Sequence, residues 1–176
     1  MTLDWRLIFS ASHLLPRPTI EFITPASAEE LAATRRIFTE YAEQLGIDLG
    51  FQNFAAELAD LPGEYGALAG ALLLVLVDGE VAGCCGLRAL DSVDYPNAAE
   101  MKRLYVRKAF RRFGLGRQLA ESALDAARAA GYRSVLLDTL YDMESARALY
   151  TDLGFEEIPP YYHNPVPGAH YLKAKL

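Results

Sequence analysis

The chain has 176 residues, of which 52% are hydrophobic and 23% are charged, and its mean hydropathy is close to zero. This size and composition are those of one globular domain and exclude a disordered or fibrous chain. The net charge of −6 provides no global attraction to nucleic acid or to anionic membranes. Any bound anion must therefore be held by a local site.

The cysteines and the apolar segments predict a cytoplasmic protein. Cys84 and Cys85 are adjacent within an apolar run and cannot by themselves build a disulfide framework or a set of metal ligands. We expect buried, reduced thiols and no bound metal. The N-terminus lacks the long apolar stretch and cleavage site of a secretory signal, and the longest apolar run, residues 66–77, is too short to span a membrane.

Periodicity and turn residues divide the chain into an N-terminal extension, residues 1–18, and one domain, residues 19–176. In chain order the predicted elements are a strand over 20–24, helices over 28–45 and 51–61, strands over 72–77, 81–87 and 101–106, a helix over 115–130, a strand over 135–138, a helix over 143–153, and strands over 155–158 and 170–175. Ser27 and Glu30 have the spacing of a capping box, and Asp78-Gly79 is a strong hairpin signal. The unit from Met101 to Asp138 predicts two parallel strands joined by a helical crossover.

The turn Arg111-Arg112-Phe113-Gly114-Leu115-Gly116 joins a strand to a helix. The first turn of a helix leaves N–H groups without partners, glycines let an anion approach the backbone, and Arg111, Arg112 and Arg117 supply positive charge. Such a turn can hold a diphosphate, but alone it fits equally well a plain helix start with solvated arginines. The motifs of a P-loop and of a dinucleotide fold are absent from the sequence.

At this point the chain resembles the GNAT superfamily of acyl-CoA-dependent N-acetyltransferases. Arg111, Gly114 and Gly116 match the family motif Arg/Gln-x-x-Gly-x-Gly/Ala, the segment 102–106 is similar to the fourth strand of the family, and the segment 146–155 is similar to its Ala-x-x-Leu-Tyr-x-x-x-Gly-Phe segment. The resemblance covers about residues 20–176. It implies an α/β (α+β) fold, with a mixed, mostly antiparallel central sheet and helices on both faces, and the transfer of acetyl from acetyl-CoA to a primary amine by direct attack.

The resemblance also implies roles for particular residues. Tyr150 would protonate the leaving sulfur, unless it only packs against the sheet with its hydroxyl bound to backbone. Glu100 would accept the proton of the amine, directly or through a water, unless it is solvated or paired with Lys102 or Arg103. The implied cofactor-binding residues are Leu104, Tyr105, Val106, Arg111, Arg112, Phe113, Gly114, Leu115, Gly116, Arg117 and Met143. Met143 departs from the asparagine that many members have at this position, which puts a side-chain hydrogen bond to the cofactor in doubt.

The acceptor is less well defined than the donor. In this fold its pocket is implied to include residues 51–53, the loop 91–97 and the segment 161–164, although those C-terminal aromatics could equally cover the edge of the sheet. The acceptor would be an amine on a small molecule or at a protein terminus, without nucleic acid or membrane as a partner. Two other interpretations remain at this point: a non-catalytic acyl-CoA-binding module, and an interaction protein that acts through its N-terminal extension or as a homodimer.

Overall fold

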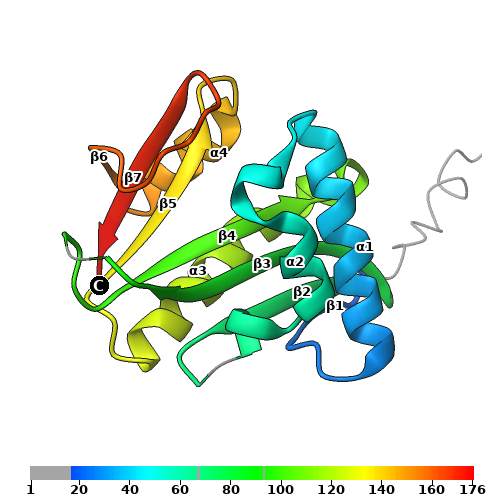
Figure 1. Cartoon of the computed structure of the whole chain (residues 1–176). Coiled ribbons are helices and arrows are strands. Elements are labelled where there is room, and N and C mark those ends of the chain that lie inside the picture. Colours follow the sequence, from blue (N-terminus) through cyan, green and yellow to red (C-terminus); the bar gives the residue numbers. More distant parts are fainter. Residues whose placement is uncertain (1–16, 67, 93) are drawn as a thin grey trace, which may run out of the picture.

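The computed structural model describes residues 17–66, 68–92 and 94–176, so the predicted N-terminal extension lies almost wholly outside the described residues. Its strands are β1 (Ile20–Ile23), β2 (Ala71–Val77), β3 (Glu80–Leu90), β4 (Ala98–Val106), β5 (Ser134–Leu140), β6 (Glu156–Ile158) and β7 (Ala169–Lys175). They form one sheet in the order β1-β2-β3-β4-β5-β7-β6 (Figure 1). Neighbouring strands are antiparallel except β4 and β5, which are parallel, so the predicted mixed, mostly antiparallel sheet is confirmed.

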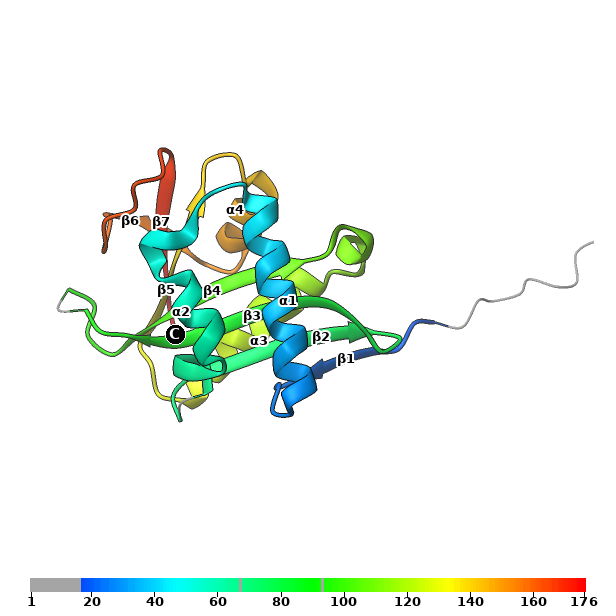
Figure 2. The same ribbon diagram turned by 45° about the vertical axis from the view of Figure 1, so that its right-hand side comes forward.

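Helices cover both faces of this sheet, as predicted. The α-helices are α1 (Ala28–Leu45), α2 (Phe54–Asp60), α3 (Leu115–Ala129) and α4 (Glu144–Asp152), and the 3-10 helices are η2 (Leu49–Gln52), η3 (Gly63–Gly66) and η4 (Lys108–Phe113). Figure 2 shows α1 and α2 in front of the sheet and α3 behind it. The described residues contain no helix that is both long and apolar enough to cross a membrane.

Two hydrophobic cores lie on opposite faces of the sheet. Beneath α1, Phe38 packs with residues such as Leu74 and Cys84, and beneath α3, Leu119 packs with residues such as Cys85. The adjacent cysteines point to opposite faces because successive side chains of a strand alternate. Both thiols are buried and free, as the sequence predicts, and burial raises their pKa values, that of Cys85 to about 12.

Local sequence explains most element boundaries. Helix α1 begins at the predicted capping box, in which Ser27 and Glu30 exchange hydrogen bonds with each other's backbone. Asp78 and Gly79 both have positive φ, at 50° and 80°, which suits the two-residue hairpin between β2 and β3. The single helix predicted over 51–61 is wrong in one respect: it is split into η2 and α2 at Asn53, whose φ of 55° is left-handed and breaks the run.

Candidate active site

The site is centred where β4 and β5 separate. The two strands pair only from Ala98 to Glu100 on β4 and from Ser134 to Leu136 on β5, and beyond these residues they diverge (Figure 1). A β-bulge accompanies the divergence, because Lys102 faces Gly86 and Tyr105 faces Cys84 across β3, which leaves two residues of β4 opposite one. The bulged residue Arg103 has a φ of 59°. The sheet therefore carries a wedge-shaped gap.

On one side of the gap lies a cleft of about 700 Å³. It is lined from α1 by Tyr41, Gln44 and Leu45, from β4 by Leu104, Tyr105 and Val106, from the turn and α3 by Arg111 and Gly116, from the end of β5 by Leu140, and from the loop before α4 and α4 itself by Asp142, Met143, Glu144, Ser145, Ala146, Leu149 and Tyr150. The cleft thus brings together an edge of β4, the side chain of one arginine and the N-terminal ends of α3 and α4.

The start of α3 borders this cleft and has free donors. Gly114 precedes the helix with a left-handed φ of 68° and gives it no side-chain cap, so the backbone N–H groups of the first turn, from Leu115 to Arg117, have no intrahelical partner. Arg111 is anchored beside them, because its Nε donates to the Val106 carbonyl at 3.1 Å. This combination of helix N-terminus and guanidinium fits a diphosphate.

The predicted cofactor-binding residues fall into two groups in the structure. Six of them line the cleft: Leu104, Tyr105, Val106, Arg111, Gly116 and Met143. The other five lie in the turn or first helical turn beside it: Arg112, Phe113, Gly114, Leu115 and Arg117. Among these, the Leu115 side chain is fully buried in the core, and Arg117 pairs with Asp152 at 2.8 Å, so neither side chain is directed to the cleft by these contacts.

Tyr150 stands where the cleft narrows. The residue is 7% exposed, its ring packs on Phe155 with centroids 5.6 Å apart, and it lines both the cleft and a passage of about 50 Å³ beyond it. No hydrogen bond joins its hydroxyl to the backbone of the described residues, which differs from the alternative of a hydroxyl tied to backbone. Burial raises the pKa of this phenol, which therefore keeps its proton at neutral pH.

The passage crosses the gap between β4 and β5. Leu104, Met143 and Tyr150 belong to both the cleft and the passage, and Gln52 and Lys102 belong to both the passage and a third cavity. Met143 also receives a hydrogen bond from the Thr139 hydroxyl to its Sδ at 3.8 Å. The cleft and the third cavity therefore lie on either side of the passage and share lining residues with it.

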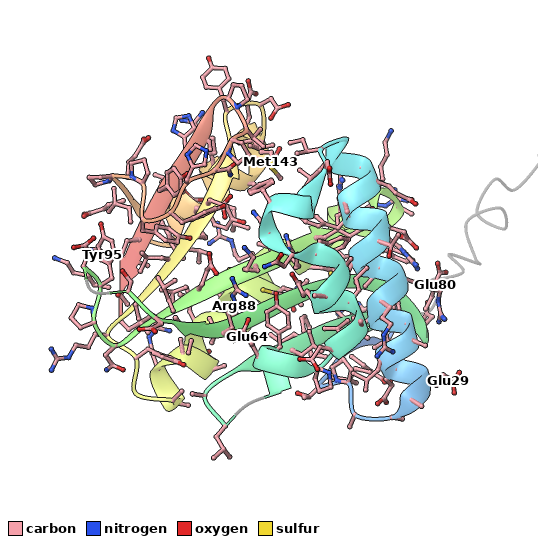
Figure 3. The ribbon with its side chains drawn as sticks, in the orientation of Figure 1. Glu29, Glu64, Glu80, Arg88, Tyr95 and Met143 are labelled. Carbon is pink, nitrogen blue, oxygen red and sulfur yellow. The ribbon has the colours of Figure 1, made fainter. Side chains whose placement is uncertain are left out.

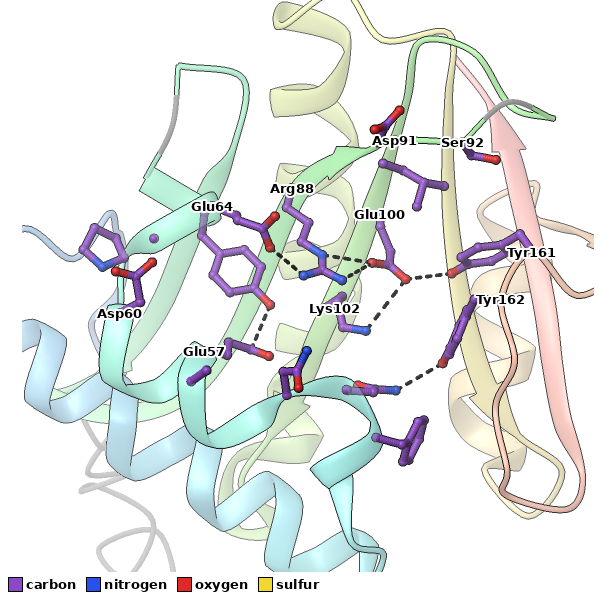
Figure 4. A pocket seen from close by; sticks show the side chains of 18 of the residues that line it. Glu57, Asp60, Glu64, Arg88, Asp91, Ser92, Glu100, Lys102, Tyr161 and Tyr162 are labelled. Carbon is purple, nitrogen blue, oxygen red and sulfur yellow. Dashed lines mark hydrogen bonds and ion pairs between the residues drawn. The ribbon is translucent and has the colours of Figure 1, made fainter.

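This third cavity, called here the acceptor pocket, has a volume of about 960 Å³ and lies between α2, η3 and the segment 161–162 (Figure 4). It contains most of the residues predicted to bind an acceptor, namely Phe51, Gln52, Asn53, Asp91, Ser92, Asp94, Tyr161 and Tyr162. His163 is exposed and does not line it. Its rim carries the carboxylates of Asp60, Glu64, Asp91 and Asp94.

Glu100 lies at the floor of the acceptor pocket, with a side chain only 3% exposed. The guanidinium of Arg88 donates two hydrogen bonds to Oε2, at 3.0 and 2.9 Å, and the Tyr161 hydroxyl donates one to Oε1 at 2.9 Å. Arg88 also pairs with Glu64 at 2.6 Å, and the two side chains face each other in Figure 3. Glu100 is thus a buried carboxylate with charged partners, rather than a solvated residue at a strand start.

A second buried ion pair joins α2 to β4. Arg103 donates to both carboxylate oxygens of Glu57, at 2.9 and 2.7 Å, and also to Gln52. The Tyr65 hydroxyl donates to the same carboxylate at 2.9 Å, and its ring lies against Gly86, where a Cβ would approach Tyr65 Cε1 to 2.6 Å. Burial alone would raise the pKa of Glu57, but Arg103 outweighs it and holds that pKa below its usual range.

Sequence reasoning missed Arg88, Glu57 and Lys102 as members of the site. Arg88 and Glu57 meet their partners across 12 and 46 residues of sequence, and no local pattern marks such pairs. A sequence feature does point to Lys102. Lys102 and Glu100 are two charged residues at alternate positions of a buried strand, and buried charged residues are rare unless they are paired or functional.

Comparisons with known proteins agree with this geometry. Residues 31–155 match the model of the acetyltransferase (GNAT) family. The chain is 35% identical over 149 residues to an uncharacterised N-acetyltransferase of Schizosaccharomyces pombe, a match that covers 84% of this chain and 90% of that protein. An acetyltransferase structure from Streptococcus agalactiae is similar with a TM-score of 0.72 at 20% identity, over 89% of this chain and 98% of that one.

The PaiA N-acetyltransferase of Thermoplasma acidophilum, determined in complex with coenzyme A, is similar with a TM-score of 0.67 at 18% identity, over 90% of this chain and 99% of that one. At such identities these two structures show the shared fold, whereas the family match rests on sequence over most of the chain. The chain therefore belongs to the acetyltransferase (GNAT) family, as its sequence predicts, and is an acetyl-CoA-dependent N-acetyltransferase.

Proposed function

We propose that this enzyme transfers acetyl from acetyl-CoA to the primary amine of an acceptor by direct attack of that amine on the thioester. The observation that carries the proposal is the succession of three neighbouring cavities: the donor cleft shares lining residues with the passage between β4 and β5, and the passage shares others with the acceptor pocket. Two reactants that enter from opposite ends would meet at the passage. Holding them there in an attack geometry would supply much of the rate.

The donor half of the proposal assigns the cleft to acetyl-CoA. The unpaired N–H groups at the start of α3, with Arg111, would hold its diphosphate, and the free edge of β4 at Leu104 and Val106 would pair with its pantetheine arm. The same edge would offer an N–H to the oxygen of the thioester carbonyl. Met143 lacks the donors and acceptors of asparagine, so its contact with the arm would be through packing alone.

Direct attack is favoured by what the passage contains. Its described lining has no serine, cysteine or histidine that could accept an acetyl group, and the hydroxyl of Thr139 is engaged with Met143. Cys84 and Cys85 are fully buried in the two cores, and their raised pKa values keep them as thiols. An acetyl-enzyme formed on serine, cysteine or histidine therefore has no candidate carrier among the described residues that line the passage.

Two side chains are proposed to move protons. Tyr150 would donate its phenolic proton to the departing sulfur, since its hydroxyl is protonated, unpaired and at the junction of cleft and passage. Glu100 would receive the proton of the amine, directly or through an intervening group, because its Oε1 lies on the acceptor side. Each such transfer contributes about 10²- to 10⁴-fold to the rate.

The negative charges at the rim of the acceptor pocket favour an acceptor that enters as an ammonium ion. The rim carboxylates attract a cation, while the depth of the pocket suits either a small amine or the end of a peptide. Tyr161, Tyr162 and Phe51 would pack against the carbon skeleton of this acceptor. Turnover measured with small amines and with a peptide tells which of the two kinds of acceptor the enzyme uses.

The test measures release of coenzyme A thiol from acetyl-CoA with a panel of primary amines: n-butylamine, 2-phenylethylamine, 1,5-diaminopentane, spermidine and an alanine-initiated peptide. We expect at least one to be turned over, and Tyr150→Phe to lower kcat with it by about 10²-fold or more while acetyl-CoA still binds. Tyr132→Phe is the matched control, because it removes a buried tyrosine hydroxyl outside the lining of the three cavities. Undiminished turnover by Tyr150→Phe would refute the acid role, and tight binding of acetyl-CoA without thiol release from any amine would refute acetyl transfer to these acceptors.

A further inference from the structure

Lys102 is an ionisable side chain beside the passage, and it is neither the proposed acid nor the proposed base. Its side chain is 5% exposed, and its Nζ makes no hydrogen bond within the described residues. The nearest charged partner is Glu100 Oε1, at 3.7 Å, and the ring of Tyr162 lies 6.0 Å from Nζ. An ammonium has three donors, and Nζ is not among the fully enclosed polar atoms that lack a partner. Because the side chain lines two cavities, these donors are open to a molecule that occupies either one.

The position of Lys102 differs from that of Glu100 in one respect that matters for catalysis. Glu100 lines the acceptor pocket but not the passage, and both of its oxygens are already occupied by Arg88 and Tyr161. Lys102 lines both cavities, and in the passage it shares the lining with Tyr150. It is the side chain that reaches from the place of attack to the carboxylate.

We infer that Lys102, as a neutral amine, is the group that takes the proton from the attacking nitrogen, with Glu100 stabilising the ammonium that results. This inference rests on the proposed function and names the intervening group between substrate and Glu100. The acceptor first loses its ammonium proton to solvent, which frees the lone pair of its nitrogen. That nitrogen then forms its bond to the acetyl carbon and gives one further proton to the lone pair of Lys102 Nζ. The C–S bond breaks, and the sulfur takes the proton of Tyr150. Lys102 then loses its proton to solvent and Tyr150 regains one, so the reaction balances.

The surroundings of Lys102 favour its neutral form before the reaction. Burial lowers its pKa, and the charges of Arg103 and Arg88 act in the same direction. Two carboxylates act against this lowering of the pKa, Glu100 on the same strand and Asp138 on β5. The other titratable groups around Lys102 are Glu57 on α2 and, in the C-terminal segment, Tyr161 and Tyr162. An ammonium ion of the acceptor that enters the same pocket adds a further like charge. Two adjacent ammonium ions would repel each other strongly in such a site, so one of them sheds its proton.

The decisive comparison is between Lys102→Arg and Lys102→Met. Arginine keeps the positive charge but cannot act as a proton acceptor near neutral pH, whereas methionine removes both properties. We expect both variants to lose about 10²-fold or more in kcat, with the fastest amine of the panel, without a change in KM for acetyl-CoA. The wild-type kcat should rise with pH through one ionisation, and this rise should be absent from Lys102→Arg. Lys175→Met, an exposed lysine on β7, is the control for loss of a lysine.

A second measurement does not depend on the acceptor or on the folding of a variant. The chain has four lysines, Lys102, Lys108, Lys173 and Lys175, so the ¹³Cε signals of the wild-type protein can be followed by NMR during a pH titration. Lys102 is expected to titrate below the exposed Lys108 and Lys175. A Lys102→Arg variant with wild-type kcat, or a Lys102 signal that titrates with those of the exposed lysines, would overturn the inference while acetyl transfer itself stands. Absence of thiol release by the wild-type enzyme would instead refute the proposed function.

Discussion

Arg103 shows how one residue can serve both the backbone and the site. A left-handed φ in a residue other than glycine costs about 1–2 kcal/mol, and Arg103 adopts it at 59° inside a strand. Its side chain offsets this cost through the bidentate pair with Glu57 and through stacking over Phe54, whose ring centre is 5.1 Å away. The contacts that fix α2 over β4 are therefore also the contacts that hold the bulge.

We predict that Glu57→Gln lowers the free energy of unfolding by about 3 kcal/mol, because it leaves the buried guanidinium of Arg103 without a counterion. Urea unfolding at neutral pH measures this loss, and Glu43→Gln, an exposed position on α1, is the control. Since the folded pKa of Glu57 is depressed, its contribution is present above the usual glutamate value of 4.5 and is lost as pH falls through the folded value. Equal stability of Glu57→Gln and wild type at pH 7 would contradict the role of the pair.

Individual site residues were predictable from the sequence only where a motif carried them. Tyr150 and Arg111 belong to segments with fixed spacing, and both line the predicted cleft. The partners of Glu100 were predictable in part: Lys102, considered from the sequence, lies 3.7 Å from its Oε1, whereas Arg103 pairs with Glu57 instead. The charge that contacts Glu100 most closely comes from Arg88 on β3. Which side chains meet across a sheet depends on the register of its strands. The register places Arg88 opposite Glu100, and the bulge at Arg103 shifts it further along β4.

At the scale of elements, the turn into α3 depends on two glycines with different requirements. Gly114 needs a left-handed backbone with a φ of 68°, whereas Gly116 is helical and an added Cβ would find only ordinary contacts, at 3.9 Å from Leu149 and Val106. The first glycine is thus required by conformation, and the second by the space that it leaves in the cleft.

We predict opposite effects on stability for alanine at these two positions. Gly114→Ala should destabilise the protein by about 1–2 kcal/mol, the cost of a left-handed alanine, and should raise KM for acetyl-CoA because the first turn of α3 shifts. Gly116→Ala should leave stability unchanged or raise it by up to about 1 kcal/mol, since alanine is the better helix former. Thermal unfolding and initial rates measure both, and a Gly114→Ala protein as stable as Gly116→Ala would show that the left-handed turn is not needed.

Element boundaries followed the sequence where local chemistry determines them. The capping box at Ser27 and the left-handed Gly46 delimit α1 at the predicted residues. Strand β4 begins at Ala98, three residues before the predicted start at Met101. The prediction began too late because Ala98, Ala99 and Glu100 have low strand propensity and pair here with β3 and β5.

For the whole molecule, we expect the narrow passage to limit the length of the acyl group that is transferred. A space of about 50 Å³, bounded by apolar side chains such as Leu104, Leu140 and Val166, suits a short acyl group. The family resemblance implied much of the lining of the two larger cavities, but local sequence patterns do not show how large they are, because they arise where β4 and β5, joined through α3, diverge after three paired residues.

We predict that kcat/KM falls at least ~10-fold from acetyl-CoA to butyryl-CoA, because an added methylene that does not fit a pocket costs about 1–3 kcal/mol. Thiol release with matched acyl-CoA concentrations measures the ratio. Met143→Ala, which enlarges the junction of cleft and passage, should reduce the discrimination. If butyryl-CoA proves as good a donor as acetyl-CoA, the passage does not set the acyl length.

Under the proposed function, the short pairing between β4 and β5 ties the stability of this enzyme to the supply of its donor. Beyond Glu100 the β5-facing edge of β4 pairs with no strand of the described residues, and the donor would complete the sheet there as a ligand that binds only the folded chain. Such a ligand at 100 times its dissociation constant adds about 2.7 kcal/mol to the free energy of unfolding. Depletion of acetyl-CoA would then withdraw substrate and structural support together, and the lifetime of the enzyme against proteolysis would follow the supply of its own donor.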